Sequence, residues 1–302
     1  MHTWKMHLYT ALLRGLQKPL SRFSPFHIEP PSADTADISY LLETTAGFTL
    51  VYIYYPQKDL HTSLPVFVNL HGGGFFMGQA EDDEKWGKYI AAETPCVVVN
   101  VDYHLAPKTQ FPDSLFEIRD VLLWLHEHNS TLGLDMGSYS LGGHSAGGNL
   151  AAATVLLLRD TGLPLPRVQI LDSPILDLHT NPRCKPAVSG AIPAAVADLF
   201  AASYLKDSQD RRHPYISPLY AKSLEELPPA LLFTPEFDSL ALEANDYAAR
   251  LRKAGTPASF HTFPGTFHAF THNGKKESAY EAWNLIIKTL RLHLLSSISE
   301  NK

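Results

Sequence analysis

The chain has 302 residues, of which 45% are hydrophobic and 19% are charged, and its formal net charge is −6. This is the composition of an ordinary globular protein, and the length suits one α/β domain with a large core. The basic residues are scattered, so the clustered Lys/Arg surface that nucleic acid or an anionic membrane would select is excluded.

The cysteines and the apolar segments set further limits. Cys96 and Cys184 form neither a disulfide framework nor a metal-ligand spacing. The apolar run 8–16 is broken by Arg14 and is followed by no signal-peptide cleavage site, and the run 150–158 is too short to span a membrane. The sequence therefore predicts a soluble, cytoplasmic protein without a membrane anchor.

The predicted elements begin with a hairpin and then alternate between strands and helices. Residues 38–44 and 48–55 alternate apolar and polar side chains around a short turn, which is typical of antiparallel strands at a sheet edge with one face in water. Short, mainly apolar runs, which we interpret as parallel strands buried on both faces, span 66–70, 97–101, 139–142, 168–171, 231–234 and 258–263. Helical spacing covers 86–93, 115–128, 149–159, 240–254 and 280–295. This order predicts an α/β fold with an eight-stranded, mostly parallel sheet flanked by helices.

Two regions interrupt this alternation. Residues 1 to about 35 combine an apolar, helix-like start with a Pro-rich linker, and residues from about 180 to 217 are Ala-rich and helical. We interpret both as a cap above the sheet of a single domain that spans 1–302. Apolar residues in these two regions, which would either contact an apolar substrate group or pack the cap onto the body, are Trp4, Leu8, Leu12, Val196, Phe200 and Tyr204.

A nucleophile motif lies between a predicted strand and a predicted helix. Residues 143–147 read Gly-His-Ser-Ala-Gly and match G-x-S-x-G, directly after the strand 139–142 and before a helix that begins near Ala146. Gly143 and Gly147 have a steric role, because side chains there would collide with the neighbouring strand and helix. The alternative is an ordinary serine in a tight turn, but the strand-turn-helix context favours Ser145 as a nucleophile.

A glycine-rich motif follows the strand 66–70. His71 and Gly72 precede Gly73 and Gly74, whose bare N–H groups, together with that of Ala146, could bind a tetrahedral oxyanion. Alone, the motif would be only a Gly-rich strand-to-helix turn. Beside a nucleophile elbow it is the pattern of lipases and esterases.

The base and the acid must follow Ser145, because this fold orders its triad as Ser, Asp/Glu, His. His268 falls in a predicted loop after the last strand, whereas His261 lies inside that strand and His272 on a helix. Asp238 follows the strand 231–234 and is favoured as the acid, with Asp172 as the alternative. Acidic residues expected to fix loops or cap helices are Asp102, Asp177, Glu236 and Glu243.

Together these motifs resemble the hormone-sensitive-lipase-like esterases of the α/β-hydrolase superfamily, over residues of about 40 to 270. Residues 102–107, Asp-Tyr-His-Leu-Ala-Pro, are similar to a further stretch of that family. The resemblance implies a helical cap, a homodimer through the last strand, and these site residues: Ser145, Asp238 and His268 as nucleophile, acid and base, with Gly73, Gly74 and Ala146 as oxyanion donors. The chain departs from the family pattern at His144, Lys108 and Ala269.

The sequence therefore predicts a serine carboxylesterase that hydrolyses short- to medium-chain esters through an acyl-enzyme. This chemistry needs no metal or cofactor, and the expected partner is a small-molecule ester. An amidase or formamidase would use the same triad, and His144 slightly favours that alternative. A non-catalytic small-molecule receptor of the same fold is a third hypothesis, against which the presence of His268 argues.

Overall fold

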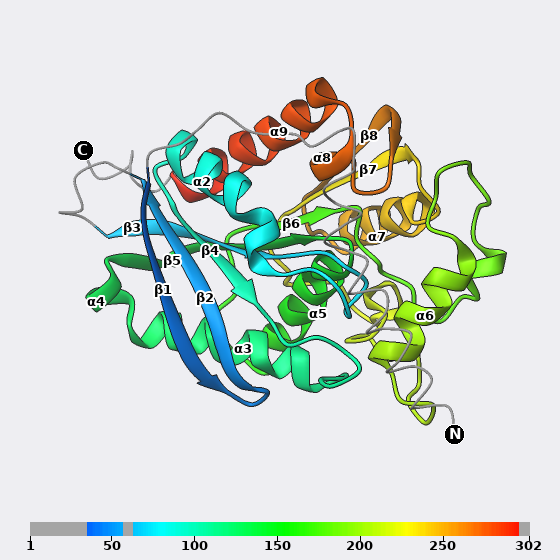
Figure 1. Cartoon of the computed structure of the whole chain (residues 1–302), viewed down its shortest axis with the longest axis horizontal. Helices are drawn as coiled ribbons and strands as arrows, with labels where there is room; N and C mark the ends of the chain where they lie inside the picture. Colours follow the sequence, from blue (N-terminus) through cyan, green and yellow to red (C-terminus); the bar gives the residue numbers. More distant parts are fainter. Residues whose placement is uncertain (1–34, 57–62, 296–302) are drawn as a thin grey trace.

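The computed structural model describes residues 35–56 and 63–295, and eight strands form one sheet there (Figure 1). The strands are β1 (Thr35–Thr44), β2 (Gly47–Pro56), β3 (Leu64–Leu70), β4 (Val97–Asp102), β5 (Leu134–His144), β6 (Gln169–Asp172), β7 (Ala230–Phe237) and β8 (Ala258–Phe267). Their order is β1-β2-β4-β3-β5-β6-β7-β8. β2 pairs antiparallel with β1 and β4, and all other pairs are parallel. The predicted eight-stranded, mostly parallel sheet is confirmed.

The hairpin of β1 and β2 forms one edge of the sheet, as the sequence predicts. Val51 and Ile53 are buried, whereas Leu41 and Phe48 are exposed, so the alternation does separate a packed face from a wet one. The backbone N–H of Thr45 in the turn donates to a carboxylate oxygen of Asp120 at 2.8 Å. This bond connects the hairpin to the helix Asp113–Glu127, which contains Asp120.

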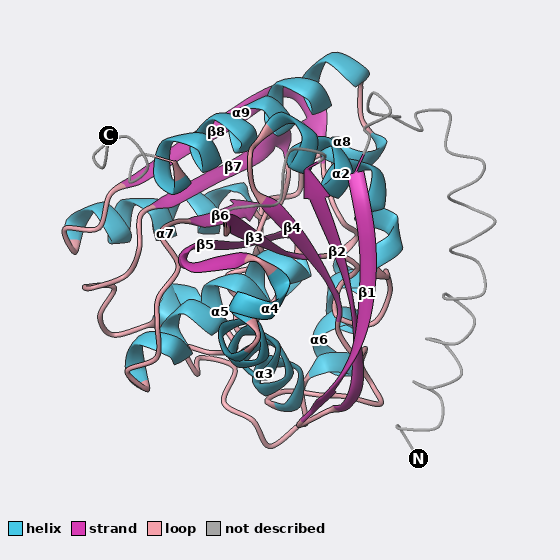
Figure 2. Cartoon of the chain, turned by 90° about the vertical axis from the view of Figure 1, so that its left-hand side faces the viewer, coloured by secondary structure: helices cyan, strands magenta, loops and turns pink. Residues whose placement is uncertain are grey.

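Helices cover both faces of the sheet (Figure 2). The helices are η1 (Ala80–Asp83), α2 (Glu84–Glu93), α3 (Asp113–Glu127), α4 (Asn129–Leu132), α5 (Ala146–Asp160), η2 (Pro182–Cys184), α6 (Ala194–Tyr204), η3 (Pro218–Tyr220), α7 (Ala241–Lys253), α8 (Phe270–Asn273) and α9 (Lys276–Leu294). One core joins α3, α5 and α7 to the sheet, and a second joins α2 and α9 to its other face. In β3, Val66 and Val68 belong to the first core and Phe67 to the second, because successive side chains point to opposite faces.

Three strands differ from the prediction. β5 begins at Leu134 rather than at 139, because an irregular register at Pro65 and Val66 lets 134 and 135 pair with the start of β3. β7 and β8 continue through segments that read as loops, since Phe237 and Phe267 pair beyond an irregularity after Pro235. The prediction that 258–263 is buried on both faces is wrong. β8 forms the second edge of the sheet, opposite β1, and most of its residues are exposed or half-buried.

The region of about 180 to 217 is less helical than the sequence suggests. Only η2 and α6 are helical between these bounds, because prolines at 182, 186, 193 and 214 interrupt the Ala-rich stretch. In Figure 1, α6 lies to the side of the sheet layers. Its Tyr204 ring stacks on Phe75 at 4.0 Å, and the Tyr204 carbonyl accepts the N–H of Phe111 at 3.0 Å.

The other predicted cap segment, residues 1 to about 35, lies outside the described residues. Among the helices within 35–56 and 63–295, none combines the length and the apolar character that crossing a membrane requires.

Candidate active site

The G-x-S-x-G motif forms a sharp turn between β5 and α5. Ser145 separates the last residue of β5 from the first residue of α5, and its φ of 54° lies in the left-handed region, which is strained for a side chain. The turn is held from both sides: the N–H of Ser145 donates to the Asp172 carbonyl at 2.8 Å, and its carbonyl accepts from Asn149 at 3.1 Å. Nucleophile elbows have this geometry.

The glycines that flank the elbow are sterically required. A Cβ atom on Gly143 or Gly147 would lie closer than 3.0 Å to the carbonyl oxygen of Leu70, at the end of β3. A Cβ on Gly147 would also meet the His71 carbonyl. The steric role predicted for both glycines is confirmed, and the turn is thereby packed directly against the Gly-rich loop.

Ser145, His268 and Asp238 form a continuous hydrogen-bond chain. His268 Nε2 lies 2.9 Å from Ser145 Oγ, and His268 Nδ1 lies 2.7 Å from Asp238 Oδ2. Asp238 is buried, and its other carboxylate oxygen accepts the N–H of Leu240 at 3.0 Å. The structure thus brings together the three residues that the sequence singles out, in the mutual arrangement of a nucleophile, a base and an orienting acid.

Asp172, the alternative acid, has other partners. Its carboxylate accepts hydrogen bonds from Ser173 Oγ and Thr271 Oγ1, both at 2.8 Å. Its backbone carbonyl accepts a hydrogen bond from the N–H of Ser145. Asp172 therefore supports the turn that carries the nucleophile, while Asp238 contacts the imidazole.

The pKa of His268 depends on opposing effects. Burial lowers the pKa of His268, but the charge of Asp238, its hydrogen bond and the charge of Asp172 together raise this pKa above its ordinary value. A raised pKa makes the ring a stronger base. It also means that the surroundings of His268 stabilise the imidazolium that forms when the ring takes a proton.

The Gly-rich loop after β3 lies beside the elbow. Gly73 and Gly74 both have positive φ, 122° and 60°, and the carbonyl of Gly73 accepts the N–H of Met77 at 2.9 Å, which closes a tight turn. A Cβ on Gly74 would meet the ring of Phe200, so α6 lies directly over this loop. Ala146 is the first residue of α5, where the positive end of the helix dipole lies.

Four other acidic residues fix loops, as the sequence predicts. Asp102 accepts the N–H of Ala80, and Glu236 accepts that of Gly265. Asp177 and Glu243 likewise accept backbone N–H groups, at residues 176 to 180. None of these bonds contacts the Ser145–His268–Asp238 chain.

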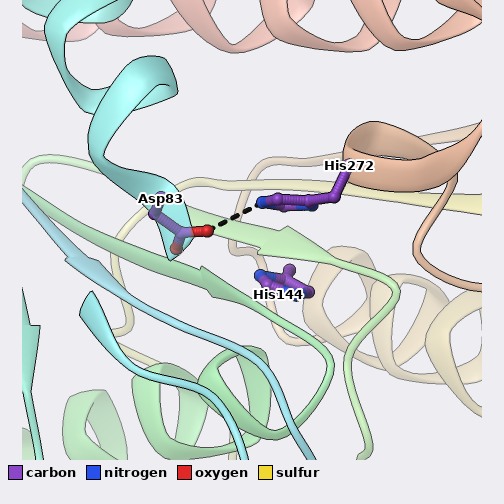
Figure 3. Close-up of side chains that lie close together, drawn as sticks. All are labelled: Asp83, His144 and His272. Carbon is purple, nitrogen blue, oxygen red and sulfur yellow. Dashed lines mark hydrogen bonds and ion pairs between the residues drawn. The ribbon is translucent and has the colours of Figure 1, made fainter. Parts of the chain in front are cut away.

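A second His–Asp pair, which the sequence reasoning missed, lies next to His144, the residue that precedes Ser145 (Figure 3). His272 Nε2 lies 2.8 Å from Asp83 Oδ1, and the ring of His144 stacks on His272 at 4.3 Å. Burial lowers the pKa of His272, but the charge and hydrogen bond of Asp83, together with the charges of Asp172 and Asp82, raise it above its ordinary value. Burial and the His272 charge lower the pKa of His144 to about 3. Only His144, a departure from the family pattern, gave a sequence signal, because the three residues are far apart in the chain.

This strand-turn-helix serine, with a histidine and a carboxylate on the loops after the last two strands, defines the class of α/β hydrolases. A family model described as the alpha/beta hydrolase fold matches residues 67–272. The chain is 33% identical to an arylesterase of Saccharolobus solfataricus, over 80% of this chain and 78% of that protein. It is also 33% identical to the carboxylic ester hydrolase LipN of Mycobacterium tuberculosis, over 86% and 71%.

Solved structures agree with these relatives. EstE1, a thermophilic carboxylesterase cloned from a metagenomic library, superposes with a TM-score of 0.84 at 30% identity, covering 94% of this chain and 97% of that one. The chain belongs to the hormone-sensitive-lipase-like family of α/β hydrolases.

Proposed function

We propose that this chain is a serine carboxylesterase in which Ser145 is the nucleophile, His268 the general base and Asp238 the orienting acid. The observation that carries the proposal is the hydrogen-bond chain from Ser145 Oγ through His268 to Asp238. The esterase names of the relatives support the ester-hydrolase class.

The proposed reaction has two steps. His268 Nε2 takes the Ser145 proton as Oγ attacks the ester carbonyl; the imidazolium then gives that proton to the leaving alcohol, and an acyl-enzyme remains. A water molecule, deprotonated by the same nitrogen, attacks the acyl-enzyme and releases the acid. Asp238 keeps the His268 ring oriented through Nδ1 and stabilises its charged form.

The proposed oxyanion hole uses backbone N–H groups of Gly73, Gly74 and Ala146. Such donors stabilise the negative oxygen more in the transition state than in the ground state, which is how they lower the barrier. Gly73 and Gly74 have positive φ angles, which glycine adopts without strain. Because glycine has no side chain, the N–H groups of both residues can approach a substrate closely, which supports this role. His71 and Gly72 lead the chain into this turn.

The proposed substrates carry short to medium acyl chains. A partly enclosed, mainly apolar pocket lies between α6 and the segments after β6 and β7, and Phe200, Ile175 and Leu240 are among its lining residues. Leu240 lies two residues after Asp238, which puts the pocket beside the acid of the chain. Phe200 also covers Gly74. We interpret η2 and α6 as part of a cap that limits acyl length.

The proposal is tested with p-nitrophenyl acetate, butyrate and decanoate and with a matched p-nitroanilide. We expect turnover of the esters that decreases toward decanoate, and a much lower rate on the anilide. A faster rate on the anilide would favour the amidase alternative, and folded protein without any turnover would favour the receptor.

The pH dependence of kcat/KM follows from His268. The base must be neutral, so a pKa raised above the ordinary histidine value of about 6.5 moves the acidic limb of the profile to higher pH. We expect kcat/KM for p-nitrophenyl butyrate to fall as pH decreases through an apparent pKa above 6.5. Recovery of full activity after return to pH 8 is the control for unfolding. A limb centred below 6 would contradict this assignment.

Phe200 is expected to limit acyl length. Phe200→Ala removes the ring that covers Gly74 and lines the pocket, so the ratio of kcat/KM for decanoate to that for acetate should rise by about 10-fold. Leu199→Ala is the matched control, because it shortens the neighbouring α6 side chain without lining this pocket. An equal ratio in wild type and Phe200→Ala would remove Phe200 as a specificity residue.

A further inference from the structure

We propose that Asp83, His144 and His272 bind one divalent cation of the Zn²⁺ type. One ligand atom from each residue lies within 4.8 Å of the others. The three come from separate parts of the chain: Asp83 ends η1, His144 ends β5, and His272 lies on α8. Figure 3 shows a nitrogen of each imidazole on the side that faces Asp83. This site is distinct from the Ser145–His268–Asp238 chain.

The donor set selects the class of cation. Two imidazoles and one carboxylate suit Zn²⁺ and other late first-row divalent ions, whereas Mg²⁺ and Ca²⁺ prefer oxygen ligands alone. Zn²⁺ bonds nitrogen and oxygen at roughly 2.0–2.2 Å, so neighbouring ligands around a tetrahedral ion stand about 3.3 Å apart. Asp83 Oδ1 and His272 Nε2 are 2.8 Å apart with a proton between them. A cation would take the place of that proton, and the stacked rings of His144 and His272, which are 27° from parallel, would have to rotate until a nitrogen of each points to it.

Hydrogen bonds already orient two of the ligands. Asn69 Nδ2 donates to Asp83 Oδ2 at 2.8 Å, which leaves Oδ1 for the cation. Thr271 Oγ1 lies 3.0 Å from His272 Nδ1, which leaves Nε2. Metal-binding histidines and carboxylates typically have such outer partners, because they fix the ring and its tautomer.

The charge and burial of the cluster favour a cation. Asp83 is buried, His144 and His272 are half-buried, and the Thr271 hydroxyl that contacts His272 Nδ1 also donates to the Asp172 carboxylate. An imidazole binds a metal ion in its neutral form. Two neutral imidazoles and one carboxylate would leave a bound Zn²⁺ with net positive charge, which Asp82 and Asp172 would partly offset.

The cation would connect three segments that carry the active site. Asp83 follows the Gly-rich loop, His144 precedes Ser145, and His272 lies four residues after His268. A bound ion should therefore stabilise these segments relative to one another, and no step of the proposed ester hydrolysis passes through it.

The test measures Zn²⁺ binding directly, independently of ester hydrolysis. Protein treated with a chelator and desalted is titrated with Zn²⁺ against a chromophoric competitor, for wild type, His144→Gln, His272→Gln and Asp83→Asn. We expect one ion per chain in wild type and at least about 100-fold weaker binding in each variant, since even loss of an outer partner costs about 10–100-fold. His261→Gln, which removes an exposed histidine on β8, should bind as wild type does.

Thermal melting with and without Zn²⁺ shows which variants fold and supplies a second readout. Wild type and His261→Gln should gain Tm with Zn²⁺, and folded variants of the three ligands should not. If one variant fails to fold, Co²⁺ added to wild type still tests the site, because four-coordinate nitrogen and oxygen ligation intensifies the visible Co²⁺ bands. No binding by wild type, or binding by His144→Gln and His272→Gln that is as tight as binding by wild type, would overturn the proposal whether or not the chain hydrolyses esters.

Discussion

Replacing Ser145 with alanine is expected to lower kcat/KM for p-nitrophenyl butyrate by roughly 10⁴- to 10⁶-fold. The reason is that His268 Nε2 would no longer have a hydroxyl to deprotonate, so no acyl-enzyme could form. The residual rate would come from the oxyanion hole and from substrate binding alone. Steady-state kinetics with an assay sensitive enough to detect this residual rate make the measurement.

A matched control for Ser145→Ala is Ser140→Ala. Ser140 is a buried serine on the same strand, β5, and its hydroxyl is 3.5 Å from the Val66 carbonyl, so it makes at most a weak hydrogen bond. This variant should keep kcat/KM within a few-fold of wild type. Comparable losses in both variants, with similar decreases in Tm, would indicate damage to the fold and contradict the assignment of Ser145.

Replacing Asp238 with asparagine is expected to lower kcat by roughly 10²- to 10⁴-fold. The amide keeps the shape of the side chain but loses the charge that orients His268 and stabilises its protonated form. Because Asp238 also accepts the N–H of Leu240, a small loss of Tm should accompany the loss of activity. Kinetics and thermal melting of the purified variant separate the two effects.

Asp172→Asn is the comparison that decides between the two carboxylates. Asp172 is buried and accepts from Ser173 and Thr271, while its carbonyl supports the N–H of Ser145 whatever the side chain is. We expect a loss of stability of about 1–3 kcal/mol and a loss of kcat below about 10-fold. A larger loss of kcat in Asp172→Asn than in Asp238→Asn would make Asp172 the acid.

The sequence was informative where local physics determines the structure. Apolar runs predicted the buried central strands, because strands covered by helices on both sides are typically apolar along their length. The turn at Ser145 was also predictable, since its flanking glycines are fixed by contact with Leu70. His268 and Asp238 followed from topology, because the carboxyl ends of parallel strands meet at one edge of the sheet.

Features set by long-range pairing could not be predicted in this way. Whether 258–263 was a central or an edge strand depended on which strand ended the sheet, although polar residues at 259, 261 and 262 are a local sign that one face of β8 is exposed. The extension of β7 and β8 through Pro235, Pro264 and Gly265 likewise depends on pairing across an irregularity. Local turn signals were outweighed by the strand pair.

The cluster of Asp83, His144 and His272 shows the same limit for a site. Each residue is unremarkable in its own segment, and only the packing of η1, β5 and α8 brings them together. His144 was recognised as a departure from the family pattern, but its contact with His272 was not predictable from spacing. A homodimer through the last strand and a cytoplasmic location stay predictions.

The most direct test of the central claim is covalent labelling of the nucleophile. The wild-type protein is treated with a fluorophosphonate, which phosphonylates activated serines, and is then digested and mapped by mass spectrometry. We predict a single adduct on Ser145, loss of esterase activity in proportion to labelling, and no labelling of His268→Ala. An adduct on another serine that accounts for the lost activity, or full turnover by protein phosphonylated at Ser145, would contradict the account.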